Sequence, residues 1–178
     1  EEAATLIKDV DAMQHLLDAF LDFARSDAAD VIAPTDLVAL LDEVMADAER
    51  TQLSLRLGTV SATGTTIAMR PQAIRRALDN LIGNALRYGT QAQISLSVAE
   101  RSVVFTVEDD GPGIPAAQRE EATRPFVRLD PSRNQDQGSG VGLGLSIVSD
   151  IARTHGGLLR LGDSESLGGL KADLVLAR

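Results

Sequence analysis

Two glycine-rich segments, residues 108–115 and 138–145, carry the residue types in this chain that could hold a nucleotide. The first reads Glu-Asp-Asp-Gly-Pro-Gly-Ile-Pro, and the second reads Gly-Ser-Gly-Val-Gly-Leu-Gly-Leu. Glycine lets the backbone pass close to a flat ring or a phosphate, because it has no Cβ to intrude. The connection between the segments is long, charged and weakly patterned. Together they predict a nucleotide site closed by a flexible lid.

Asp109 is the carboxylate of the first segment, and Gly111 and Gly113 follow it. A carboxylate only accepts hydrogen bonds, so it can accept one from the exocyclic amine of adenine. Guanine would present a carbonyl oxygen there, and the two acceptors would repel each other. Such a charge-assisted bond contributes ~1.5–3 kcal/mol. Read alone, Asp-Asp-Gly-Pro-Gly is also a good turn sequence.

The second segment alternates Gly138, Gly140, Gly142 and Gly144 with other residues, and a predicted helix follows. Free backbone amides at the start of a helix attract phosphate. No Gly-Lys-Ser/Thr follows, so this is not a Walker loop. No strand leads directly into it, so it is not a Rossmann fingerprint either. The alternative interpretation is a flexible glycine linker.

Asn80 and Asn84 lie four residues apart on one side of a predicted helix. Asn is unfavourable in a helix interior, so the pair indicates a task for the side chains. Asn84 can give an oxygen to a Mg²⁺ ion that bridges phosphates, and Asn80 can hold one of its waters. Arg87 and Arg133 are cationic candidates for phosphate. The alternatives are satisfied polar groups at a buried edge and solvated surface charges.

The elements that must position these residues are predicted by hydrophobic periodicity. Alternating apolar residues predict strands at 53–57, 65–69, 94–98, 103–107, 158–161 and 170–176, with Gly58 ending the first of them. Helical spacing predicts helices over 37–45, 71–86 and 144–154, with Asp36 as a cap and Pro71 in a first turn. The order is helix, strands, helix, hairpin, lid, helix, hairpin. It predicts an α+β fold with helices on one face of a mixed sheet.

The first 25 residues carry a heptad seam, formed by Leu6, Val10, Met13, Leu17, Phe20 and Ala24. A lone helix of this length is marginal, so it needs a partner, such as a second copy of the chain. The alternative is an ordinary amphipathic helix lying on its own domain. Residues 26–35 contain Pro34 and break the pattern, so we expect a linker there and a domain over 36–178.

The composition excludes several function classes. The chain has 178 residues, 44% of them hydrophobic, which is enough for one domain with a good core. A formal net charge of −9 makes it a poor nucleic-acid binder. It contains no cysteine, which excludes disulfides, thiol catalysis and cysteine-ligated zinc. No apolar run approaches the ~18 residues of a membrane span.

Four motifs, in this order, resemble the GHKL-type ATP-binding domain of bacterial sensor histidine kinases. An asparagine box is similar to residues 78–88, and a first glycine box is similar to 107–115. A phenylalanine box is similar to 124–130, and a second glycine box to 138–145. The resemblance covers residues 36–178. The segments Arg-Pro-Gln-Ala-Ile-Arg-Arg-Ala and Arg-Pro-Phe-Val-Arg resemble the EnvZ-like kinases in particular.

The resemblance implies a two-layer α/β sandwich of the GHKL (Bergerat) type, with a mainly antiparallel sheet and with ATP and Mg²⁺ as cofactors. It assigns Asp109 to the adenine amine and Asn84 to Mg²⁺. It places Asn80, Arg87 and Tyr88 beside them, facing the nucleotide. The remaining nucleotide contacts that it implies are Gly111 and Gly113 at the base, Phe126 and Arg133 in the lid, and Gly140, Gly142, Leu143 and Gly144 at the phosphates.

Residues 1–25 resemble the second helix of the family's dimerisation and phosphotransfer hairpin. The phosphorylated histidine of the family lies in a box that nothing here matches. His15 is followed by Leu-Leu-Asp and is expected on a helix surface or seam, and His155 is followed by Gly-Gly and is expected in a loop. In the phenylalanine box Thr123 takes the place of a first aromatic residue, so only Phe126 remains. We therefore expect a kinase fragment that binds ATP and has its phosphoacceptor on another segment.

The ATP-hydrolysing members of the superfamily have a glutamate one turn before the magnesium asparagine, as a base for water. Here that place holds Asn80, which cannot take a proton. The resemblance thus implies phosphoryl transfer to a histidine on a dimerisation helix, and then to a response regulator. It also implies a homodimer through residues 1–25 and a cytoplasmic domain of an inner-membrane sensor. The alternatives are a regulatory nucleotide-binding module without kinase turnover and a serine kinase of the anti-sigma type.

Overall fold

The computed structural model describes residues 30–62, 66–127 and 142–178. The expected helix over residues 1–25 lies outside the described residues, as does the first part of the expected linker. No helix in the described ranges is long and apolar enough to cross a membrane.

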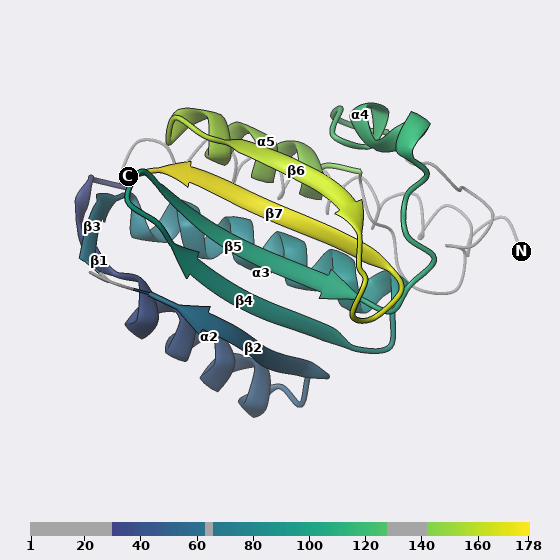
Figure 1. Cartoon of the computed structure of the whole chain (residues 1–178), viewed down its shortest axis with the longest axis horizontal. Helices are drawn as coiled ribbons and strands as arrows, with labels where there is room; N and C mark the ends of the chain where they lie inside the picture. The colour runs from purple at the N-terminus through teal and green to yellow at the C-terminus, as the bar shows by residue number, and fades with distance from the viewer. Residues whose placement is uncertain (1–29, 63–65, 128–141) are drawn as a thin grey trace, which may run out of the picture.

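A five-stranded sheet forms one layer of the molecule (Figure 1). Its strands lie in the order β2 (Leu55–Ser61), β4 (Ala92–Val98), β5 (Ser102–Asp109), β7 (Leu170–Ala177), β6 (Leu158–Asp163). β2 pairs with β4 in parallel, and the other neighbours are antiparallel. The sheet is therefore mixed and mainly antiparallel, as the sequence predicted.

Three helices, α2 (Leu37–Arg50), α3 (Pro71–Tyr88) and α5 (Gly144–Thr154), form the second layer, behind the sheet in Figure 1. Every second residue of β5 is buried beneath them, including Val103, Phe105 and Val107. A buried side chain of this size contributes about 1.5–3 kcal/mol. The α+β fold with helices on one face is thus confirmed, and the burial pattern of β5 continues to its last residue, Asp109.

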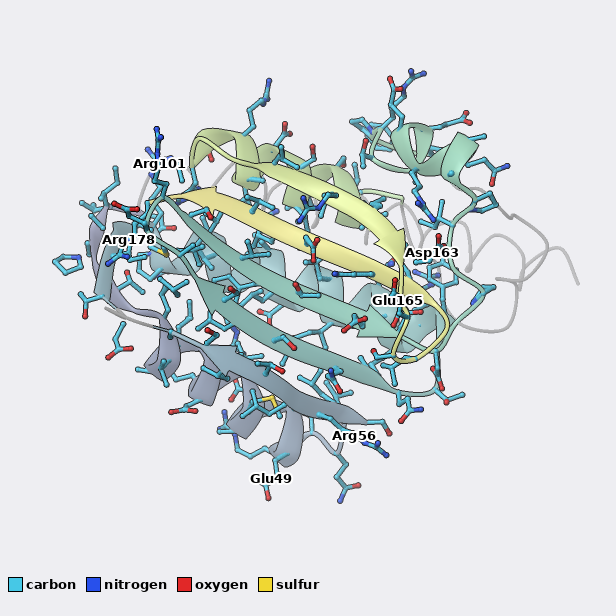
Figure 2. The ribbon with its side chains drawn as sticks, viewed as in Figure 1. Glu49, Arg56, Arg101, Asp163, Glu165 and Arg178 are labelled. Carbon is cyan, nitrogen blue, oxygen red and sulfur yellow. The ribbon has the colours of Figure 1, made fainter. Side chains whose placement is uncertain are left out.

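Local signals explain where two of the helices begin. The Asp36 carboxylate caps α2, because its Oδ1 accepts hydrogen bonds from the amides of Val38 at 3.0 Å and Ala39 at 3.2 Å. Pro71 opens α3, where its missing amide hydrogen is no loss. Two short helices, η1 (Ala116–Gln118) and α4 (Arg119–Ala122), lie in the stretch after the first glycine segment. The Arg119 guanidinium ties that stretch to the sheet, since it donates to Asp163 at 2.6 Å, a residue near the β6–β7 turn (Figure 2).

The structure differs from the sequence-based expectation at two places. The last three residues of the expected linker form, together with Asp36, the strand β1 (Ala33–Asp36), which pairs with β3 (Thr66–Met69) in a separate two-stranded sheet. Pro34 is tolerated because this pair is an edge on both sides. Gly58 does not end its strand, because β2 continues past it with a register shift between Leu57 and Val60. A Cβ on Gly58 would overlap the side chains of Ser95 and Gln93, so a larger residue at the bulge would require those side chains to move.

Candidate functional site

The predicted site residues gather at one end of the two-layer fold. The end of β5 carries Asp109, the second half of α3 carries Asn80 and Asn84, and α5 begins at Gly144. In Figure 1 these segments meet toward the right-hand end of the sheet, where β5 ends and β7 begins. The fold thus brings together residues that three separate motifs supply.

The Asp109 carboxylate is buried, with 3% of the residue exposed. Its Oδ1 accepts hydrogen bonds from the amides of Gly111 at 2.8 Å and Leu170 at 3.0 Å. Both bonds end on Oδ1, so Oδ2 takes part in neither of them. Burial raises the pKa of Asp109, the two backbone amides oppose that rise, and the neighbouring Asp110 adds to it. The site therefore holds one carboxylate oxygen by the backbone and offers the other to a hydrogen-bond donor.

The β6–β7 turn packs directly on Asp109. The Gly169 amide donates to the Asp109 carbonyl at 2.9 Å, and a Cβ on Gly169 would overlap the Asp109 carboxylate and lie 2.5 Å from the Gly111 nitrogen. Only glycine allows this approach. Gly169 and Leu170 lie in the hairpin that the sequence predicts, but they were not predicted as neighbours of the site. The sequence shows the glycine itself, but it does not show that Gly169 packs against Asp109, which lies far away in the chain.

The two glycines after Asp109 are also closely surrounded. A Cβ on Gly111 would lie 2.9 Å from the Tyr88 carbonyl oxygen, at the end of α3. Gly113 has a positive φ of 69° and faces Gly169, with 3.6 Å from an ideal Cβ position to its carbonyl carbon. Gly111 therefore has no room for a side chain beside the end of α3, and the positive φ of Gly113 favours glycine there. The assignment of Gly111 and Gly113 to an adenine ring stays a prediction.

Asn80 lies beside the start of α5. Its Nδ2 donates to the Arg76 carbonyl at 2.9 Å, and its Oδ1 would lie 3.4 Å from a Cβ on Gly144. Asn84, one turn further along α3, is half-buried on the same side of that helix. Amide oxygens are hard ligands, which suit Mg²⁺ in a site where the ion keeps most of its waters. The donor set on α3 therefore fits the predicted magnesium ion.

The ends of the predicted lid meet. The Phe126 amide donates to the Gly142 carbonyl at 3.0 Å, and a Cβ on Gly142 would lie 2.8 Å from the Val127 carbonyl oxygen. Both Phe126 and Gly142 have a positive φ, and Phe126 is 59% exposed. Leu143 follows, and its carbonyl accepts bonds from the first turn of α5. Arg133 and Gly140, also predicted in the site, lie outside the described residues.

The last turn of α3 carries Arg87, which is half-buried, and Tyr88, which is 44% exposed. Both stand at the end of the helix that meets the first glycine segment. Their predicted contacts with a nucleotide are consistent with this position and stay predictions.

His155 has a role that sequence analysis missed. It lies in the turn after α5, as expected, but its Nε2 accepts a bond from the Arg70 amide at 3.3 Å. The other nitrogen, Nδ1, is 2.8 Å from the Ile151 carbonyl and must carry the hydrogen in this arrangement. The bond joins the end of α5 to the start of α3, while Gly144, at the start of α5, lies beside Asn80 in the middle of α3. The two helices therefore run antiparallel.

Comparisons with known proteins agree with this arrangement. Residues 69–176 match the family described as histidine kinase-, DNA gyrase B- and HSP90-like ATPases. The chain is 37% identical over 176 residues to the sensor protein RstB of Escherichia coli, a match that covers 96% of the chain and 40% of RstB. It is 35% identical over 172 residues to the sensor histidine kinase GtrS of Pseudomonas aeruginosa, a match that covers 96% of the chain and 34% of GtrS.

A solved structure gives the same result for the fold. The NMR structure of the histidine kinase domain of the E. coli osmosensor EnvZ has a TM-score of 0.60 and 37% identity, covering 83% of this chain and 88% of that one. The chain therefore spans less than half the length of RstB and GtrS but most of the EnvZ domain structure.

Proposed function

This chain belongs to the family of histidine kinase-, DNA gyrase B- and HSP90-like ATPases, and on that premise we propose that it binds ATP and donates the γ-phosphate to a histidine side chain. RstB, GtrS and EnvZ are sensor proteins, and the resemblance to the ATP-binding domain of sensor histidine kinases is confirmed. The chain has the GHKL fold of these domains.

The observation that carries the proposal is the environment of Asn80. Its Nδ2 is bonded to the Arg76 carbonyl, so its Oδ1 is the atom turned toward the start of α5. An amide oxygen can accept a hydrogen bond from water but cannot take a proton from it at neutral pH. The position that precedes Asn84 by one turn therefore offers no general base. Transfer to an outside nucleophile is favoured over hydrolysis.

The adenine end of the site is built around Asp109. Its Oδ1 is held by two backbone amides, and Oδ2 would accept a hydrogen bond from the exocyclic amine of adenine. A guanine carbonyl at the same place would meet a buried negative charge, which costs free energy. Gly111 and Gly113 would flank the base, with Tyr88 beside it. This arrangement would select ATP over GTP.

The phosphate end would use α3 and the start of α5. The amides of Gly142, Leu143 and Gly144 precede or open α5, where backbone amides lack partners within the helix and attract phosphate. Asn84 would hold a magnesium ion, with Asn80 positioning one of its waters, and the ion would neutralise phosphate charge. Arg87, together with the lid residues Phe126, Arg133 and Gly140, would complete the enclosure.

The transfer itself would be a displacement at the γ-phosphorus. The bond from this phosphorus to the β,γ-bridging oxygen breaks, a bond to an imidazole nitrogen forms, and ADP leaves. The protein would contribute position and charge neutralisation, which carry most of the catalysis in phosphoryl transfer. The acceptor histidine would lie on a dimerisation helix, and the phosphoryl group would then pass to an aspartate of a response regulator.

The whole protein would be a homodimer joined through residues 1–25, whose heptad seam favours pairing with a second copy. We propose that it is a membrane-anchored sensor and that this domain lies in the cytoplasm. Nucleic acid is not expected as a partner, because the net charge of −9 opposes phosphate-backbone contacts.

The test is a transfer experiment in two parts. The chain is mixed with Mg²⁺, ATP labelled on the γ-phosphate, and a separately made dimerisation hairpin that contains the acceptor histidine. We expect acid-labile, alkali-stable label on the hairpin and none on a His→Gln hairpin. Acid-stable label would indicate a hydroxyl acceptor and contradict the proposal. Bound ATP without any transfer would favour a regulatory nucleotide-binding module.

A further inference from the structure

Asp110, the residue after the predicted adenine contact, binds the loop that follows α3. Its Oδ1 accepts hydrogen bonds from the amides of Thr90 at 2.7 Å and Gln91 at 3.1 Å. Its Oδ2 accepts a third from the Thr90 hydroxyl at 2.5 Å. These bonds lower the pKa of Asp110 to about 2, with the Thr90 hydroxyl as the largest cause. The carboxylate is therefore ionised and engaged on both oxygens.

Two glycines let this contact form. A Cβ on Gly89 would lie 2.6 Å from Asp110 Oδ1 and 3.0 Å from the Ala85 carbonyl oxygen. A Cβ on Gly111 would lie 2.9 Å from the Tyr88 carbonyl oxygen. The end of α3 and the segment after β5 thus approach each other as closely as backbone allows. A residue with a side chain at either place would push the two apart.

The contact joins the two halves of the candidate site. Asp109, immediately before Asp110, pairs with Ala92 in the β4–β5 register, and Thr90 and Gln91 lead into that strand. On the other side of the same loop, α3 ends with Arg87 and Tyr88 and carries Asn84 one turn earlier. The hydrogen bonds from the loop to Asp110 therefore set the separation between the Asp109 carboxylate and the polar side of α3.

We propose that Asp110 is a positioning residue, which holds the end of α3 at the distance from Asp109 that a nucleoside triphosphate spans. The role is indirect, since the geometry ties both Asp110 oxygens to the α3–β4 loop and the effect on the ligand would pass through the end of α3. The inference rests on the proposed function, since it assumes that adenine lies at Asp109 and phosphate at α3. It adds a residue to which the four motifs assign no role.

The alternative is that Asp110 only stabilises a turn. Asp36 provides a control, because it is also an aspartate that accepts hydrogen bonds from two backbone amides, at the start of α2. Its side chain serves the α2 cap, away from the candidate site. Asp36→Ala and Asp110→Ala should both lower the melting temperature. Only Asp110→Ala should also change the affinity for a nucleotide.

The experiment measures binding of a non-hydrolysable ATP analogue with Mg²⁺ to the 178-residue chain by calorimetry. We expect Asp110→Ala to weaken binding about tenfold or more, because small misplacements of a site are costly. Asp110→Asn should restore affinity to within about twofold of the native chain, because its amide oxygen accepts from Thr90 and Gln91, while its nitrogen can donate to the Thr90 hydroxyl.

Backbone amide NMR signals provide a second readout. In Asp110→Ala the signals of Arg87, Tyr88 and Gly111 should shift. The signal of His155, which lies after α5 and beside the start of α3, should stay in place. Thr90→Val removes a single bond and is the variant to use if Asp110→Ala does not fold. It should weaken binding measurably while the chain stays folded.

Equal affinities in the native chain, Asp110→Ala and Asp36→Ala would overturn the positioning role and leave the proposed function intact. If Asp110→Ala does not fold, unchanged affinity in Thr90→Val would overturn it. A loss of affinity in Asp110→Asn as large as that in Asp110→Ala would also overturn the positioning role. The side-chain oxygen that accepts from Thr90 and Gln91 would then be present without maintaining nucleotide binding. A native chain that does not bind the ATP analogue would overturn the proposed function, and the inference with it.

Discussion

The amide oxygen of Asn80 faces the first residue of α5: an ideal Cβ on Gly144 would lie 3.4 Å from Asn80 Oδ1. The fold thus brings the asparagine box beside the second glycine box, although the β4–β5 hairpin, the first glycine box and the lid separate them in the sequence. The side-chain nitrogen of Asn80 is already bonded to its own helix at the Arg76 carbonyl. The orientation of the amide is therefore fixed before any ligand enters, and its acceptor oxygen points to the phosphate end of the proposed site.

Asp109→Asn should lower the affinity for ATP by more than tenfold, because Oδ2 is replaced by an amide group that binds the adenine amine less well. A tenfold loss corresponds to ~1.4 kcal/mol, which calorimetry resolves easily. Asp173→Asn is the matched control, since Asp173 is also a buried aspartate but bonds Thr106 and Arg160 on the other face of the sheet. Unchanged ATP affinity in Asp109→Asn would exclude the adenine role.

Asp109→Asn should not destabilise the fold at neutral pH. Burial raises the pKa of Asp109, so the folded chain holds this proton more tightly than the unfolded chain. Ionisation of Asp109 therefore costs stability as the pH rises through the folded pKa. Removing the charge should raise the melting temperature or leave it unchanged. A clear fall in melting temperature at neutral pH would contradict this interpretation.

Asp110 should behave in the opposite way in acid. Its folded pKa of about 2 lies below the ordinary value of 3.8, so its ionised form stabilises the fold. This contribution to stability is fully present above pH 3.8 and is lost as the pH falls toward about 2. Over this window the melting temperature of the native chain should therefore fall more steeply with falling pH than that of Asp110→Asn. If the melting temperatures of the two proteins fall equally as the pH is lowered over this window, the Asp110 carboxylate contributes no stability there.

Asn84→Ala should remove the Mg²⁺ dependence of ATP binding, because it deletes the proposed ligand oxygen. The measurement compares the dissociation constants for ATP with Mg²⁺ and with EDTA, in the native chain and in the variant. Gly83→Ala is the control on the neighbouring position, and it should keep the metal dependence. If Asn84→Ala binds ATP with the same gain from Mg²⁺ as the native chain, another group holds the ion.

Gly83→Ala should also stabilise the protein. Gly83 lies in the exposed interior of α3, and a Cβ there would meet nothing within 4 Å. Alanine in place of an exposed helical glycine typically contributes about 0.5–1 kcal/mol. Urea unfolding should show a higher midpoint with an unchanged slope. A lower midpoint would mean that the helix needs its glycine for a contact that the fold alone does not reveal.

Gly169→Ala should lower both stability and ATP affinity. A Cβ at this position would overlap the Asp109 carboxylate and its carbonyl, and forcing the two apart costs about 1–3 kcal/mol. Gly162→Ala, on β6, is the control, because a Cβ there would meet nothing within 4 Å. The two variants are compared by thermal unfolding and by calorimetry with ATP. Equal behaviour of the two would show that the turn adjusts without moving Asp109.

Much of the fold could be predicted because its signals are local. The alternation of Val103, Phe105 and Val107 and the four-residue steps along α3 each follow from burying one face of one element. The bulge at Gly58 and the strand at Ala33–Asp36 could not be predicted in this way. Both depend on a partner strand, β4 or β3, that supplies the second half of the hydrogen bonds. Pairing of that kind leaves almost no trace in the sequence of either strand taken alone.

The sequence by itself determined which chemical groups the site contains: a carboxylate at Asp109, amides at Asn80 and Asn84, and glycines where backbone must approach a ligand. These are properties of residue type and short-range spacing. Only the tertiary structure decided which atoms of those groups are used. Leu170 and Gly169 fix the Asp109 carboxylate, Arg76 and Gly144 orient the Asn80 amide, and Thr90 binds Asp110.

The physical reason for this division is the reach of each interaction. A helix or strand is chosen by contacts among residues a few positions apart, which a sequence displays directly. A buried polar atom is instead oriented by whichever donor the fold brings within about 3 Å, and that donor can come from any part of the chain. His155, interpreted as a turn residue from its neighbours, bonds the Arg70 amide for this reason.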